Sequence, residues 1–235
     1  MIYGDLFEAS RETQTDRPFA LQNSKMLKVL VQDQPVMARL GSMVAYQGQI
    51  GFEHAGHGGL GKMFKAAATG EGVPLMRCTG HGELFLADSA AEVQVLYLEN
   101  DEISVNGASV LAFSAGIEWD IQRISARGAA LTGGLYNVSM RGTGFVAVTT
   151  KGVPVALDVA SAPTFADAQA VVLWTAGVRM DVKVDTGGLR SMIRGGTGET
   201  LQMAFGGRGV VIVQPAENVA QDAGEQSGSS GGLFG

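Results

Sequence analysis

The 235-residue chain has one cysteine, few aromatic residues and few charged ones. Cys78 has no second cysteine to pair with inside the chain, so cysteine usage does not indicate an oxidising compartment. No window approaches the roughly 18 uninterrupted apolar residues that a membrane-spanning helix needs. Residues 1–17 also lack the apolar stretch of a secretory signal. These absences predict a cytoplasmic protein.

Positive charge is scarce as well. The chain carries 17 Lys and Arg against 23 Asp and Glu, which gives a net charge of −6. A protein that binds nucleic acid usually has a basic excess or a basic stripe that displaces counterions from the phosphates. Nucleic acid is therefore not an expected partner.

Two sequence patterns occur three times each. The first surrounds Tyr46, Phe113 and Trp174 with small and apolar residues, and the second is a Gly-x-Gly followed by an apolar run at 80–86, 142–148 and 207–213. Two landmarks with one period, roughly 61–67 residues, indicate an internal triplication. The predicted organisation is an N-terminal extension, three repeats and a flexible Gly/Ser-rich tail, with the boundaries 1–19, 20–90, 91–153, 154–215 and 216–235.

Alternating apolar and polar residues predict strands throughout the repeats. The clearest runs lie at 27–31, 93–98, 103–106, 153–159 and 180–184, each bounded by turn-forming residues. An all-β fold follows, with the three repeats in a pseudo-threefold arrangement. The Gly-x-Gly pairs are predicted to supply positive φ at tight hairpin turns. The three repeated aromatic residues are predicted to anchor the core of each repeat, in preference to forming a platform for stacking bases.

An ordered set of motifs resembles a known family. They are GSMVAYQGQIGFE (41–53), GGLGKMFKAAATGEG (58–72), NGASVLAF (106–113), SMIRGGTGETLQMAF (191–205) and GRGVVIVQP (207–215). The motifs look like those of the bacterial relatives of a mitochondrial protein named for altered inheritance of mitochondria. The resemblance runs from about Ala20 to Pro215.

The resemblance implies three TRAP-like repeats, each similar to one subunit of the tryptophan RNA-binding attenuation protein, a β-sandwich (double-stranded β-helix) that assembles into rings. It also implies a homotrimer in which three chains of three repeats form a nine-unit ring. The family has no established catalytic residues to carry over. Its mitochondrial member is linked to inner-membrane organisation, and its bacterial members have no settled role.

Four residues have spacings that suit zinc ligands: Cys78 with His81, and His54 with His57. The repeats argue against this site, because Cys78 corresponds to the apolar Met140 and Phe205, which indicates a core position. His81 corresponds to Thr143 and Arg208, which indicates an exposed turn. The sequence therefore predicts no metal site and no cofactor.

Catalytic motifs are not found. The chain has no Gly-x-Ser-x-Gly elbow, and its three histidines all lie within 54–81. The glycine-rich run at 56–61 resembles a phosphate-binding loop, but Gly61 and Lys62 are followed by Met63 where that loop needs Ser or Thr. The chain is predicted not to be an enzyme.

Two segments combine basic and apolar residues. Lys62 and Lys65 are three apart, and Arg190 and Arg194 are four apart, so on a helical turn each pair would share one side. One interpretation is an anionic-surface patch that contacts lipid headgroups or an acidic protein. The other is a helical plug that caps the sandwich and leaves its bases solvated.

The sequence therefore predicts a non-enzymatic, ring-forming scaffold or interaction protein, which leaves open a peripheral association with a membrane. The alternative is an RNA- or small-ligand-binding ring like that of the attenuation protein. A third hypothesis is an unrecognised hydrolase-like activity.

Overall fold

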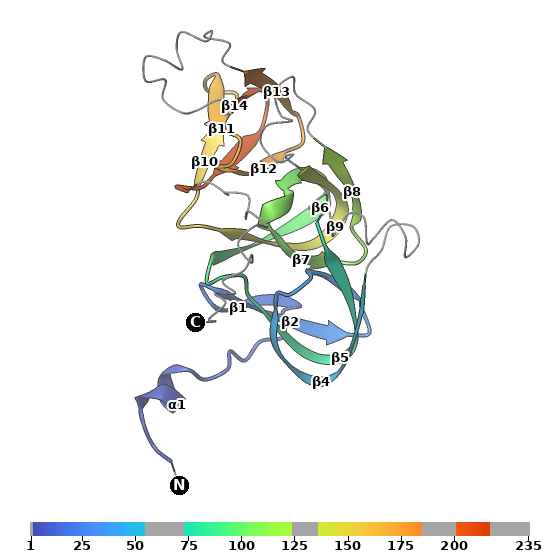
Figure 1. Cartoon of the computed structure of the whole chain (residues 1–235). Helices are drawn as coiled ribbons and strands as arrows, with labels where there is room; N and C mark the ends of the chain where they lie inside the picture. The colour runs from blue at the N-terminus through green and yellow to red at the C-terminus, as the bar shows by residue number, and fades with distance from the viewer. Residues whose placement is uncertain (1, 55–72, 124–135, 185–200, 217–235) are drawn as a thin grey trace, which may run out of the picture.

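A computed structural model describes residues 2–54, 73–123, 136–184 and 201–216 of the chain (Figure 1). This part is all-β, as predicted, apart from the helix α1 (Asp5–Ala9) and a 3-10 turn η1 (Gly107–Ser109). The strands are β1 (Phe19–Asn23), β2 (Met26–Gln32), β3 (Val36–Arg39), β4 (Met43–His54), β5 (Leu75–Leu86), β6 (Glu92–Asn106), β7 (Val110–Ser114), β8 (Glu118–Arg123), β9 (Tyr136–Thr150), β10 (Val155–Asp158), β11 (Thr164–Asp167), β12 (Val171–Thr175), β13 (Val178–Val184), β14 (Leu201–Gly207) and β15 (Val210–Val213).

The strands form two antiparallel sheets. The larger one has 12 strands in the order β1-β2-β5-β3-β7-β9-β6-β12-β15-β10, with β4 paired to β5 and β8 paired to β9. The smaller one has three strands in the order β11-β14-β13. In Figure 1, β4 and β5 lie at one end of the molecule, and β11, β13 and β14 lie at the opposite end. None of the described helices is long and apolar enough to cross a membrane.

Alternation along the strands explains the packing. In β2, Leu27, Val29 and Val31 are fully buried, because they point to one face of the sheet and into the core. Buried side chains of this kind gather into three apolar clusters. The first contains Phe19, Leu27, Cys78 and Leu84, the second contains Ile103, Phe113, Met140 and Val146, and the third contains Trp174, Met203, Phe205 and Val211.

The Gly-x-Gly pairs do not form hairpin turns, so that prediction was wrong. Gly80 and Gly82 lie inside the continuous strand β5, which pairs with β2 and β3 in succession and also with β4. The prediction of positive φ is confirmed, since φ is +114° at Gly80. A side-chain carbon at Gly80 would lie 2.1 Å from the carbonyl oxygen of Gln49 in β4. The glycine therefore lets two strand backbones approach closely where β5 passes from one partner to the next.

Candidate functional site

The four predicted patch residues, Lys62, Lys65, Arg190 and Arg194, lie outside the described residues. The anionic-surface patch and the helical plug therefore both stay predictions. The predicted positions that the structure does describe are the aromatic residues and three of the four candidate metal ligands.

The three aromatic residues occupy one register position but differ in burial. Phe113 is 0% exposed and Trp174 is 7% exposed, so both anchor the core as predicted. Tyr46 is 47% exposed, so for this residue the prediction was wrong. The reason lies in the neighbouring strands: β7 and β12 have a strand on each side, whereas β4 pairs with β5 alone among the described strands.

Two strand pairings, which we call the internal joints, contain Phe113 and Trp174. In the first, β3 pairs with β7, with Met37 opposite Phe113. In the second, β6 pairs with β12, with Ser104 opposite Trp174. In each joint, a strand that lies earlier in the chain pairs with the strand that carries the aromatic residue.

A side-chain hydrogen bond closes each internal joint. The Arg39 guanidinium donates to the carbonyl oxygen of Val110 at 2.8 Å, and the Asn106 amide donates to the carbonyl oxygen of Val171 at 3.0 Å. Both donors end the first strand of their joint, and both acceptors begin the second strand. The two joints therefore share a backbone pairing and a donor in the same place.

At one end of the molecule, β4 forms an edge of the larger sheet among the described strands and carries exposed apolar side chains (Figure 1). Met43, Val44, Tyr46 and Phe52 are all exposed along this 12-residue strand. Exposed apolar groups on an edge strand provide a template for pairing with another chain.

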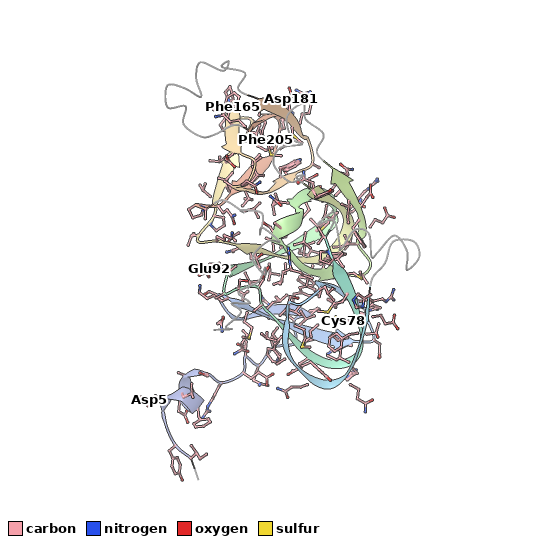
Figure 2. The ribbon with its side chains drawn as sticks, viewed as in Figure 1. Asp5, Cys78, Glu92, Phe165, Asp181 and Phe205 are labelled. Carbon is pink, nitrogen blue, oxygen red and sulfur yellow. The ribbon has the colours of Figure 1, made fainter. Side chains whose placement is uncertain are left out.

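A second edge lies at the opposite end of the molecule. There β11 borders the smaller sheet, and β10 ends the order of the larger one. Phe165 in β11 is 51% exposed, and Val153 and Val155 are also exposed. Figure 2 shows Phe165 at this end, far from Cys78 in the other half of the molecule. The two edges therefore lie at opposite ends of the molecule (Figure 1).

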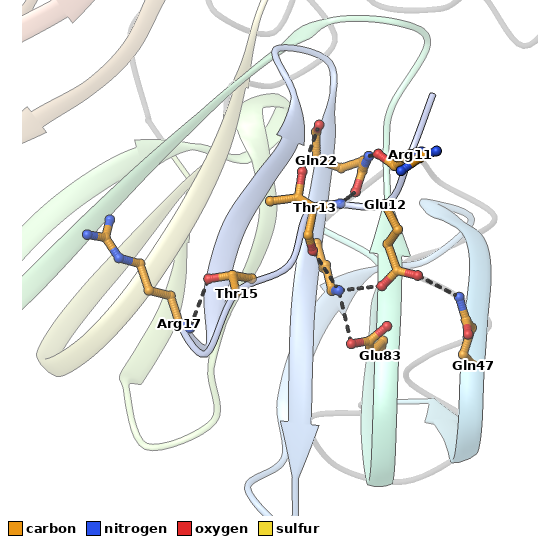
Figure 3. Close-up of polar contacts among 9 residues, drawn as sticks. Arg11, Glu12, Thr13, Thr15, Arg17, Gln22, Gln47 and Glu83 are labelled. Atoms are coloured by element: carbon orange, nitrogen blue, oxygen red, sulfur yellow. Dashed lines mark hydrogen bonds and ion pairs between the residues drawn. The ribbon is translucent and has the colours of Figure 1, made fainter. Parts of the chain in front are cut away.

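We call residues 11–17 the N-terminal strap, and a polar cluster joins Glu12 and Thr13 of this strap to side chains of β2 and β4 (Figure 3). The Lys28 side chain is only 1% exposed and forms ion pairs with Glu12 and Glu83. Its ammonium group also donates to the carbonyl oxygen of Thr13 at 2.9 Å, and the Gln47 amide donates to Glu12 at 3.1 Å. The sequence did not reveal this cluster, because a lysine within an alternating strand normally indicates a solvated face.

The ionisation of the cluster follows from these contacts. Hydrogen bonds with Glu83 and with Lys28 hold the pKa of Glu12 below its ordinary value. Burial alone would lower the pKa of Lys28, but the hydrogen bonds with Glu12 and Glu83 outweigh it and raise that pKa. The charged forms of Glu12 and Lys28 therefore favour an attached strap.

We expect the strap to detach in acid. Because folding lowers the pKa of Glu12, its stabilising contribution is complete above the ordinary value of 4.5 and is lost as the pH falls below it, through the lowered pKa. An NMR titration would follow the backbone resonances of residues 11–17. Glu12→Gln should already show shifted strap resonances at neutral pH and should lack the acidic transition. An unchanged strap in this variant would contradict the assignment.

The described candidate ligands do not form a site together. Cys78 is fully buried, which confirms its predicted core position, and burial raises the pKa of its thiol to about 11. His81 is exposed and lies inside β5, where a turn was expected, and His54 is exposed at the end of β4. His57 lies outside the described residues. Among the residues that are placed, no group of three or more His, Cys, Asp or Glu could hold a metal ion.

Comparison with known families identifies the chain's relatives. The model of the mitochondrial biogenesis AIM24 family matches residues 19–216. The chain belongs to this family. No curated protein sequence matches it.

A solved structure supports the fold of this AIM24-family chain. A protein from Streptococcus pyogenes, known from an X-ray crystal structure, is similar with a TM-score of 0.69 at 21% sequence identity. The match covers 85% of this chain and 92% of the other. At this identity the likeness establishes a shared all-β architecture and nothing about activity.

Proposed function

We propose that this AIM24-family chain is a non-enzymatic scaffold that assembles head to tail through the strand edges at its two ends. The observation that carries the proposal is the half-exposed Tyr46, which occupies the register position that buries Phe113 and Trp174. Among the described strands β4 has β5 as its one neighbour, and a strand from a second copy would pair with its other side. It would also remove two exposed sheet edges.

A closed ring of three copies is the expected form of this assembly. A head-to-tail contact gives a ring when its rotation closes and an open filament when it does not. Two considerations favour the ring: the sequence triplication, and the resemblance to chains built of three TRAP-like repeats. In such a ring the internal joints and the contact between copies would be variants of one arrangement.

The scaffold would act through its surface and use no catalytic residue or cofactor. The bases at Lys62, Lys65, Arg190 and Arg194 are its proposed contacts with an acidic protein or an anionic membrane surface, and repetition around a ring would add avidity. The family is described by mitochondrial biogenesis, and the proposal places the scaffold in that process.

Negative-stain electron microscopy tests the ring. The expected result is a single class of closed particles with threefold symmetry, whose size does not grow as the protein concentration rises. Filaments that lengthen with concentration would show the head-to-tail contact without closure. Single elongated monomers at every concentration would refute the scaffold.

A further inference from the structure

We propose that the contact between copies is an antiparallel pairing of β11 with the first half of β4, in the register of the internal joints. In this self-joint, Phe165 of one copy lies opposite Tyr46 of the next. Ala166 then lies opposite Ala45, and Thr164 lies opposite Gln47. The inference rests on the proposed head-to-tail assembly and specifies which residues make it.

The register follows from positions relative to the glycine pairs. Phe113 lies opposite Val146 and Trp174 lies opposite Val211, in each case two residues after the second glycine. Tyr46 lies opposite Leu84, which also follows the second glycine, Gly82, by two residues. Tyr46 therefore has the same register position in β4 that Phe113 and Trp174 have in β7 and β12, the strands of the internal joints.

The partner of Tyr46 is found in the same way. Met37 lies opposite Arg77, and Ser104 lies opposite Ser139, in each case three residues before the first glycine of the pair. The corresponding residue in the last group of strands is Phe165, opposite Ala204, three residues before Gly207. Since Met37 lies opposite Phe113 and Ser104 lies opposite Trp174, Phe165 is the residue placed opposite Tyr46.

The exposure of these two residues agrees with the register. Met37 and Phe113 are both buried, and both belong to one apolar cluster. Tyr46 is 47% exposed and Phe165 is 51% exposed. Pairing across the self-joint would therefore bury aromatic surface of both residues. Aromatic pairs across antiparallel strands are among the favourable ones.

One residue makes the self-joint different from the internal joints. Asp167 corresponds to the donors Arg39 and Asn106, and it would face the carbonyl oxygen of Met43. A carboxylate cannot donate a hydrogen bond, so this contact is missing. The local turn is otherwise the same, because Asn106 accepts from the Ala108 amide at 3.0 Å and Asp167 accepts from the Gln169 amide at 2.6 Å. The self-joint is therefore weaker than the internal joints.

Disulfide trapping tests the register. Directly opposed residues of antiparallel strands have Cα atoms about 4.5–5.5 Å apart, which suits a disulfide. Ala45→Cys with Ala166→Cys, oxidised by copper phenanthroline, should give covalent oligomers on a non-reducing gel. The matched control, Ala45→Cys with Thr164→Cys, is offset by two residues and should cross-link far less. Cys78 does not compete, because it is fully buried.

The outcomes separate the two proposals. If the control variant cross-links and the opposed pair does not, the register is wrong and the proposed scaffold is still supported. A protein that is monomeric and does not cross-link would overturn both. Cross-linking of the opposed pair alone supports both.

If Asp167 weakens the self-joint, replacing it with a hydrogen-bond donor should raise the affinity between copies. Asp167→Asn supplies the amide donor and keeps the acceptor for Gln169, so the dissociation constant of the assembly should fall by about three- to tenfold, the worth of one neutral hydrogen bond. Asp158→Asn, at the end of β10, removes the same charge outside the self-joint and should leave that constant unchanged. Equal effects of the two substitutions, or none from Asp167→Asn, would refute the assignment.

Discussion

Gly80→Ala is expected to lower the free energy of unfolding by about 3–5 kcal/mol, or to prevent folding. The substitution has two costs. The backbone at Gly80 has φ of +114°, a conformation that a residue with a side chain rarely adopts. The new methyl group would also lie 2.1 Å from the carbonyl oxygen of Gln49, so β4 and β5 would have to separate. Urea denaturation followed by circular dichroism would measure the loss.

Gly51→Ala is the matched control for this prediction. Gly51 lies in the same strand pair, has no positive φ, and would place its methyl group 3.4 Å from the Thr79 hydroxyl oxygen. Its effect should stay within about 1 kcal/mol, as for most substitutions without a specific clash. If both variants were equally stable, the close approach of β4 and β5 would not constrain Gly80.

Tyr46→Glu is expected to weaken the assembly by more than about 100-fold, because it replaces a buried aromatic anchor with a charge in the contact. The monomer should keep its fold, since Tyr46 is already half exposed there. Sedimentation velocity over a range of concentrations would show the 24.4 kDa species. The melting temperature, measured below the dissociation constant, should match that of the wild-type monomer.

Val155→Glu is the comparison for the assembly. Val155 is an exposed apolar residue of the edge strand β10, which takes no part in the proposed self-joint. This variant should assemble like the wild type. Dissociation by Val155→Glu and not by Tyr46→Glu would place the contact on β10 and overturn the pairing of β11 with β4.

Local patterns in the sequence account for most of the strands. Alternation correctly predicted β2, both halves of β6 and most of β13, because a strand that buries one face has apolar residues at every second position. The expected strand at 153–159 is shorter, Val155–Asp158. The glycine pairs were misread as hairpins because positive φ signals a sharp change of backbone direction without saying whether the strand ends there.

The candidate site was harder to predict, because it depends on neighbours far away in the sequence. The repeated pattern around Tyr46 also surrounds Phe113 and Trp174. The exposure of Tyr46 accompanies the place of β4 in the sheet, since β4 pairs with β5 alone among the described strands. Phe165 could have been found by extending the repeat alignment to the strand before each aromatic residue, where Met37 and Ser104 stand. Burial of Lys28 depends on the strap, which lies outside the repeats.

The central claim, that the chain assembles through its two ends, is tested most directly by its mass in solution. Light scattering on a size-exclusion column should give a value near three times 24.4 kDa for the wild type, unchanged on tenfold dilution. A single species of 24.4 kDa at high concentration would contradict the account. Tyr46 would then be an exposed aromatic with no second copy to cover it.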